Sequence, residues 1–217
     1  MSALRLLKQV LYSVGTRIAM VALRLARNAL LARILGPADR GLFAMLNALA
    51  ELLASLGGGG LQHAAAYQAA NRAPVSALVT LILVLGSGMA LLTAAVGTGV
   101  LQWPALQQQL GEDMQGLVWL LLLAVPLIVL KTVLTAMSNA LGDIHGFNLL
   151  RLTESLAPLL LFLALFGWWY SAGLSVAIIS WLAGLGLVIM LALVLTHRAH
   201  SLRPAWSTPL ARDLWHY

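Results

Sequence analysis

Basic side chains interrupt the apolar stretch that opens the chain, where Arg17, Arg24 and Arg27 stand among leucine, alanine and valine residues. A charge in the middle of a bilayer costs roughly 2.5–3.5 kcal/mol, so such a residue usually faces a protein interior or a wet cavity. The polar residues of this segment recur four or seven positions apart and share one helical face: Gln9, Ser13, Arg17, Arg24 and Asn28. The pattern favours binding of an anion. The alternative is that Arg17 reaches the membrane surface while Arg24 and Arg27 form structural ion pairs.

A second polar stripe follows in the next apolar segment at spacings of three or four residues: Asn47, Glu51, Ser55, Gly58 and Gln62. Arg24 and Glu51 stand at similar heights when residues are counted from the ends of the two segments, because a helix rises about 1.5 Å per residue. We therefore expect Glu51 to form an ion pair with Arg24 or Arg27. The amides of this stripe, together with Asn28, are expected to support the same cavity.

Lys131 lies roughly ten residues from the end of a later apolar segment, too deep to reach the membrane surface easily. It either faces the cavity or forms a structural ion pair with Glu154. Cations in surplus over the single carboxylate of Glu51 would attract an anionic headgroup. The predicted substrate-binding residues are Arg17, Arg24, Arg27 and Lys131.

Four consecutive glycines interrupt the second stripe: Gly57, Gly58, Gly59 and Gly60. They lack the GxxxxGK pattern of a phosphate-binding loop. They are compatible with close helix packing or with a hinge, an unwound segment beside a binding cavity. Both interpretations remain open.

Nothing in the sequence predicts an enzyme, because no nucleophile–base pair and no paired carboxylates occur within a short span. The chain contains no cysteine, and His197 and His200 alone are a weak signal for metal binding. We expect no metal and no cofactor. The net charge of +6 is better explained by membrane topology than by nucleic-acid binding, because the basic residues are dispersed among apolar helices and short loops.

The composition indicates a membrane protein, with 61% hydrophobic and only 9% charged residues in 217, against roughly 25% charged in soluble domains. Residues 73–111 and 155–197 contain no Asp, Glu, Lys or Arg. A spanning helix needs roughly 20 apolar residues, so each run can hold at least one. We predict an all-α polytopic membrane protein.

About six transmembrane helices are expected within a bundle of residues 1–198, with a cytoplasmic linker at 199–217. Their approximate ranges are 6–35, 39–70, 74–101, 114–140, 147–166 and 174–196. Basic residues gather in alternate connections, with Arg5, Lys8, Arg72, Arg151, Arg198, Arg203 and Arg212 on one side and Arg33 and Arg40 on the other. The positive-inside rule then places both termini in the cytoplasm.

Four segments, taken in order, resemble those of a known family. Residues 31–44, LARILGPADRGLFA, resemble the junction of the first two helices of bacterial polysaccharide flippases, which commonly reads LARxLGPxxxGxxA. Residues 56–67 resemble the glycine-rich end of the second helix, residues 139–151 the turn between the fourth and fifth helices, and residues 202–214 the linker into the second half. The chain resembles the oligosaccharide flippase (Wzx-like) branch of the multidrug/oligosaccharidyl-lipid/polysaccharide exporter superfamily.

This resemblance implies transport of a lipid-linked oligosaccharide, carried on undecaprenyl pyrophosphate, across the bacterial cytoplasmic (inner) membrane by alternating access. It implies a fold of two halves, of which this chain matches only the first six-helix half-bundle. We expect the bilayer, the lipid-linked oligosaccharide and a second half-transporter as partners, and we expect no complete transport by this chain alone. The alternatives are a drug exporter of the same superfamily, which should carry acidic cavity residues, and a truncated or non-transporting membrane scaffold.

The charge distribution makes a testable prediction about topology. Reporter fusions after Arg72, Gly146 and Arg203 should report a cytoplasmic location, and fusions within residues 107–113 and at Ser171 should report the outside. A clear reversal at one internal connection would contradict the six-helix topology.

Overall fold

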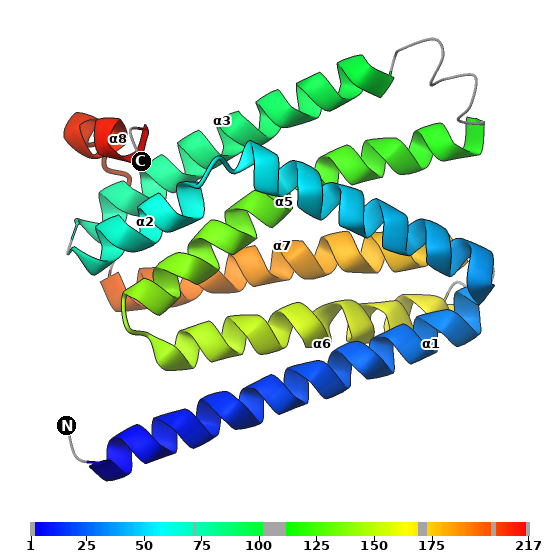
Figure 1. The fold of residues 1–217 in the computed structure, drawn as a ribbon, viewed down its shortest axis with the longest axis horizontal. Coiled ribbons are helices and arrows are strands. Elements are labelled where there is room, and N and C mark those ends of the chain that lie inside the picture. Colours follow the sequence, from blue (N-terminus) through cyan, green and yellow to red (C-terminus); the bar gives the residue numbers. More distant parts are fainter. Residues whose placement is uncertain (1–2, 72, 102–111, 169–172, 201–202, 216–217) are drawn as a thin grey trace.

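The computed structural model describes residues 3–71, 73–101, 112–168, 173–200 and 203–215, and these ranges form helices and short connections without a strand (Figure 1). The helices are α1 (Ala3–Gly57), α2 (Leu61–Ala70), α3 (Val75–Leu101), α5 (Glu112–Ala140), α6 (Ile144–Trp168), α7 (Gly173–His200) and α8 (Thr208–Trp215). The all-α prediction is confirmed.

Among the described residues, four helical segments are long and apolar enough to cross a membrane: Val75–Gly99, Leu122–Ala140, Ile144–Gly167 and Gly173–His200. Large apolar side chains such as Leu92, Val96 and Met190 remain exposed on the outside of the bundle. An apolar outer surface suits lipid rather than water, and the chain is an all-α polytopic membrane protein. The two arms of α1 are not among the four segments, so the count of six spans stays a prediction.

Helix α1 consists of two arms that meet at Gly36, where φ is 77° and ψ is 176°. A side chain at this φ would be strained, so glycine permits the turn. Pro37 follows and has no backbone N–H to continue the hydrogen-bond ladder. The break falls between the expected helical ranges 6–35 and 39–70, and it folds the two arms into one bundle (Figure 1).

A second break separates α1 from α2 within the glycine run, for which the sequence left close packing and an unwound segment open. Gly59 and Gly60 have positive φ values of 48° and 81°. Gly57 lies so close to α3 that an added Cβ would overlap the Thr93 side chain. Close packing and an interrupted helix are therefore both observed here, and whether the break moves as a hinge stays a prediction.

Helix α5 lies centrally and packs against α1, α2, α3, α6 and α7. Its inward side chains, including Val125, Val133, Leu134 and Met137, are almost fully buried. The N-terminus, the α2–α3 connection, the α5–α6 turn and α8 lie toward one end of the bundle, and the turn at Gly36 lies toward the other (Figure 1). Gln107, Ser171 and Arg72, where the topology prediction places reporter fusions, lie outside the described residues.

The tail that was expected to be a linker contains α8. This helix packs against α2 and α3, with Leu210 and Leu214 buried. The backbone N–H of Ala205 donates a hydrogen bond of 3.3 Å to Thr80 Oγ1. An apolar stripe of two residues in an eight-residue segment is too short for its periodicity to predict a helix from the sequence.

Helices α6 and α7 approach closely at Gly184, where an added Cβ would lie 2.6 Å from Pro158 Cγ and 3.2 Å from the Pro158 backbone nitrogen. Gly184→Ala should therefore destabilise the protein by about 1–3 kcal/mol, the usual cost of overpacking. Thermal unfolding of the detergent-purified chain would measure the loss.

Gly186 provides the matched control on the same helix, because nothing lies within 4 Å of an added Cβ there. Gly186→Ala should be neutral or slightly stabilising, because alanine is favoured over glycine within a helix. Equal effects of the two substitutions would contradict the close approach of α6 and α7.

Candidate functional site

Two adjoining cavities, each of about 210 Å³, lie between α1, α5 and their neighbours. We define the arginine cavity by its lining residues: Arg24, Arg27, Asn28, Asn47, Glu51, Ile128, Lys131, Glu154, Pro158, Trp181, Gly184 and Leu185. The glycine cavity is lined by Glu51, Ala54, Ser55, Gly58, Gly60, Gln62, Ile128, Val129, Lys131, Thr132 and Val133. Three residues, Glu51, Ile128 and Lys131, belong to both, so the two cavities meet at their side chains.

The turn at Gly36 explains how one helix supplies two walls of the arginine cavity. Arg24 and Arg27 come from the first arm of α1, and Asn47 and Glu51 come from the second. Each set recurs at three or four residues, which keeps its members on one face of its arm. The folded-back arms turn these two faces toward the same space.

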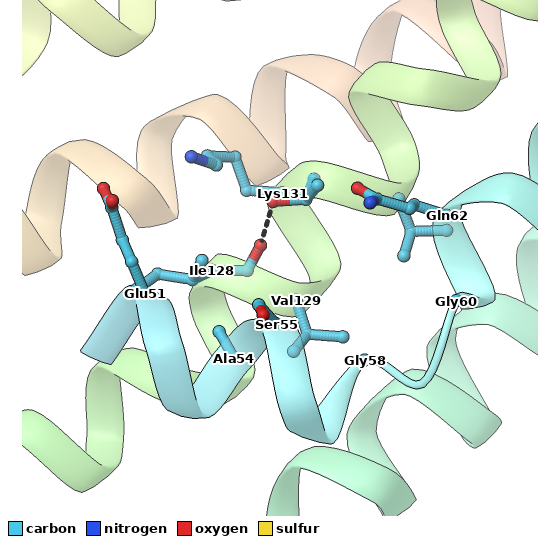
Figure 2. A pocket seen from close by; sticks show the side chains of 11 residues that line it. Glu51, Ala54, Ser55, Gly58, Gly60, Gln62, Ile128, Val129 and Lys131 are labelled. Carbon is cyan, nitrogen blue, oxygen red and sulfur yellow. Dashed lines mark hydrogen bonds between the residues drawn. The ribbon is translucent and has the colours of Figure 1, made fainter. Parts of the chain in front are cut away.

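The glycine cavity extends from the charged residues to the helix break. The Lys131 ammonium and the Glu51 carboxylate lie toward one end, and Gln62 lies toward the other (Figure 2). Side chains from α1 and α5 form the long walls. Gln62 Nε2 lies 3.2 Å from His63 Nε2, at hydrogen-bond distance.

The Glu154 carboxylate on α6 is the centre of the ion pairs. Lys131 Nζ on α5 donates a hydrogen bond of 2.9 Å to Glu154 Oε1, and their side chains are only 15% and 19% exposed. The guanidinium of Arg151 lies 3.7 Å from Oε2. Arg24 on α1 reaches Oε1 at 4.0 Å. One carboxylate therefore connects cations of three helices, α1, α5 and α6.

The expected ion pair of Glu51 with Arg24 or Arg27 is not formed, and Glu51 has no salt bridge within 4.0 Å among the described residues. Arg24 reaches Glu154 instead. The estimate from residue counts compared only the depths of Arg24 and Glu51 along their helices. It could not give the rotation of each helix about its axis. Lys131 follows the alternative that the sequence left open, a pair with Glu154, and at the same time lines both cavities.

Arg27 differs from the other cations of the cavity because it makes no hydrogen bond or salt bridge with any residue that the structure describes. Its Nε is buried and has no acceptor. The like charge of Arg24 and the opposite charges of Glu154 and Glu51 line the same cavity. A buried donor without an acceptor is costly, so this guanidinium can accommodate an acceptor that enters the cavity.

Three cations and two carboxylates line the arginine cavity: Arg24, Arg27 and Lys131 against Glu51 and Glu154. One positive charge is thus in surplus. The surplus is smaller than the sequence predicted, because Glu154 contributes a second carboxylate and Arg17 does not line either cavity.

No family model, no curated protein and no solved structure matches this chain.

Most of the predicted site residues meet in space. Arg24, Arg27, Asn28, Asn47 and Glu51 line the arginine cavity, and Gly58, Gly60 and Gln62 line the glycine cavity. The remaining predicted residues lie elsewhere: Arg17 is exposed on α1, Gly59 is exposed in the break, and Gly57 borders an apolar groove on α3. Glu154 was considered only as a partner of Lys131, and Trp181 was not predicted at all, because an isolated tryptophan in an apolar run carries no sequence signal of a cavity.

The ion-pair geometry predicts that Glu154→Gln will be strongly destabilising. The substitution leaves the Lys131 ammonium buried without a counterion, and breaking one side of a buried pair costs about 3–5 kcal/mol. Accumulation of the protein in the membrane and its thermal unfolding in detergent would both decrease.

Two further variants make this test specific. The double variant Lys131→Met, Glu154→Gln removes both charges and should recover most of the loss. Glu51→Gln, which breaks no ion pair, should leave accumulation close to that of the wild type. A larger loss for Glu51→Gln than for Glu154→Gln would contradict the observed pairing.

Proposed function

We propose that this chain binds the anionic headgroup of a lipid-linked oligosaccharide and acts as half of a transporter that moves it across the bacterial cytoplasmic membrane. In this proposal both termini are cytoplasmic and a second half completes the transport pathway, with alternating access between the halves. The site lies in the arginine cavity, and the family resemblance of the four sequence segments suggests the pyrophosphate and the glycan.

The observation that carries the proposal is the buried Nε of Arg27, which has no acceptor among the described residues, in a cavity with surplus positive charge. A pyrophosphate oxygen would supply the acceptor that Arg27 lacks. Guanidinium groups bind phosphate through two parallel hydrogen bonds, and Arg24, held by Glu154 only at 4.0 Å, can turn toward the same ligand. Lys131 is already committed to Glu154 and acts as a structural cation.

Neutral polar groups beside the arginines suit the sugar that follows a pyrophosphate. The amides of Asn28 and Asn47 line the same cavity and can donate to and accept from hydroxyl groups. Trp181 adds an apolar surface to the wall. Its ring lies 6.1 Å from that of Phe43 in an edge-to-face arrangement, which holds it in place.

Binding of farnesyl pyrophosphate to the purified chain in nanodiscs tests this function. Farnesyl pyrophosphate should bind and uncharged farnesol should not, because the ligand contacts are ionic. Arg27→Gln should weaken binding about 10-fold to 100-fold, corresponding to the roughly 1.5–3 kcal/mol of a hydrogen bond to a charged group. Equilibrium titration would measure the change.

Arg33→Gln is the matched control, because Arg33 is exposed on the same helix and lines neither cavity. It should bind with wild-type affinity. Binding of the lipophilic cation tetraphenylphosphonium in place of the pyrophosphate would indicate a drug exporter. Binding of neither probe would leave a membrane scaffold as the better description.

A further inference from the structure

Arg17 continues the polar stripe of α1 away from the arginine cavity. It precedes Arg24 by seven residues and Asn28 by eleven, so the three side chains share one side of the helix. Arg24 and Asn28 line the cavity, while Arg17 is exposed about two turns nearer the N-terminus. The stripe thus leads from the cavity toward the end that is predicted to be cytoplasmic.

Arg151 continues the cavity wall on α6 in the same way. It precedes Glu154 by three residues and Pro158 by seven, and both of these line the cavity. Its side chain is 40% exposed and reaches Glu154 Oε2 at 3.7 Å. The guanidinium also lies 5.9 Å from the centre of the Phe147 ring, which holds it over α6.

The register between the two helices places Arg17 and Arg151 at one level. Helices α1 and α6 pack together and run in the same direction from the end that holds the N-terminus (Figure 1). The rings of Tyr12 and His145 are 5.2 Å apart and define a common starting height. Arg17 follows Tyr12 by five residues, roughly 7.5 Å, and Arg151 follows His145 by six, roughly 9 Å.

We infer that Arg17 and Arg151 form the mouth of the arginine cavity and draw the pyrophosphate headgroup toward Arg24 and Arg27. This inference rests on the proposed function and adds the route by which the ligand arrives. Charges of one sign that line a cleft raise association rates about 10-fold to 1,000-fold. Both side chains remain partly exposed, so they attract the ligand without being desolvated, and charges in such rim positions change the association rate more than the dissociation rate.

Surface plasmon resonance on the full chain in nanodiscs tests the route with farnesyl pyrophosphate as the probe. Arg17→Gln and Arg151→Gln should each lower the association rate constant about threefold or more and leave the dissociation rate constant near its wild-type value. Arg17→Glu should slow association further than Arg17→Gln. Arg151→Lys should restore the association rate constant that Arg151→Gln lowers. Raising the ionic strength should diminish the differences, because salt screens exposed charges.

Arg33→Gln is the control for a change of charge on α1, because Arg33 lies sixteen residues beyond Arg17, on the opposite side of the helix. It should not change the association rate constant. Unchanged association in the Arg17 and Arg151 variants, or an effect confined to dissociation, would overturn the route while leaving the proposed function intact. Failure of the wild type to bind would reject both.

Inorganic pyrophosphate, as a second probe, distinguishes a lipid headgroup from a soluble diphosphate. Inorganic pyrophosphate should bind more weakly than farnesyl pyrophosphate, and its association rate constant should depend on Arg17 in the same way. This result would support a mouth that recognises the headgroup of a lipid. Equal affinity for the two probes would contradict a lipid-linked ligand and the proposed function with it.

Discussion

The arrangement of the bundle depends on the ion pairs that the Glu154 carboxylate forms. An unpaired ammonium at the position of Lys131 would be expensive in an apolar surrounding, and the 2.9 Å hydrogen bond to Glu154 removes that cost. The pair joins α5 to α6, and the longer contact with Arg24 adds α1. Glu154 therefore links the inward faces of three helices, and the arginine cavity lies where those faces meet.

The arrangement also depends on the shape of the α1 backbone. A straight α1 could not place both of its polar stripes beside the Glu154 carboxylate. The positive φ of Gly36 folds the second arm back on the first, and the glycines at 59 and 60 interrupt that arm again beside the cavity. Each break is permitted by residues that act locally, through the missing Cβ of glycine and the missing N–H of proline. Local signals of this kind predicted the break between residues 35 and 39 from the sequence, whereas the glycine run left close packing and an unwound segment open.

The partners of the charged residues could be predicted only in part. Helical periodicity assigned Arg24 and Asn28 to one polar face and Glu51 to another, and all three line the arginine cavity, because the face of a residue depends on its neighbours in sequence alone. Whether Arg24 meets Glu51 or Glu154 depends on the rotation and crossing of helices that are distant in sequence, and counting residues from helix ends does not give these. For the same reason, the sequence could not show that Arg17 lies outside the cavity. It also did not predict α8, a helix that packs against α2 and α3.

The cations of the arginine cavity divide into those that stabilise the bundle and those that remain free for a ligand. Lys131 makes a short, nearly buried pair with Glu154, and an anion could recruit its ammonium only by competing with that carboxylate. Arg24 is held weakly at 4.0 Å and is about half exposed, so the same competition costs less there. Arg27 has no acceptor to give up among the described residues, and a cavity of about 210 Å³ has room for several water molecules around it. In the proposed function, an incoming anion would engage Arg27 first, Arg24 second and Lys131 last. Binding of the proposed anion therefore does not require the ion pair between α5 and α6 to break.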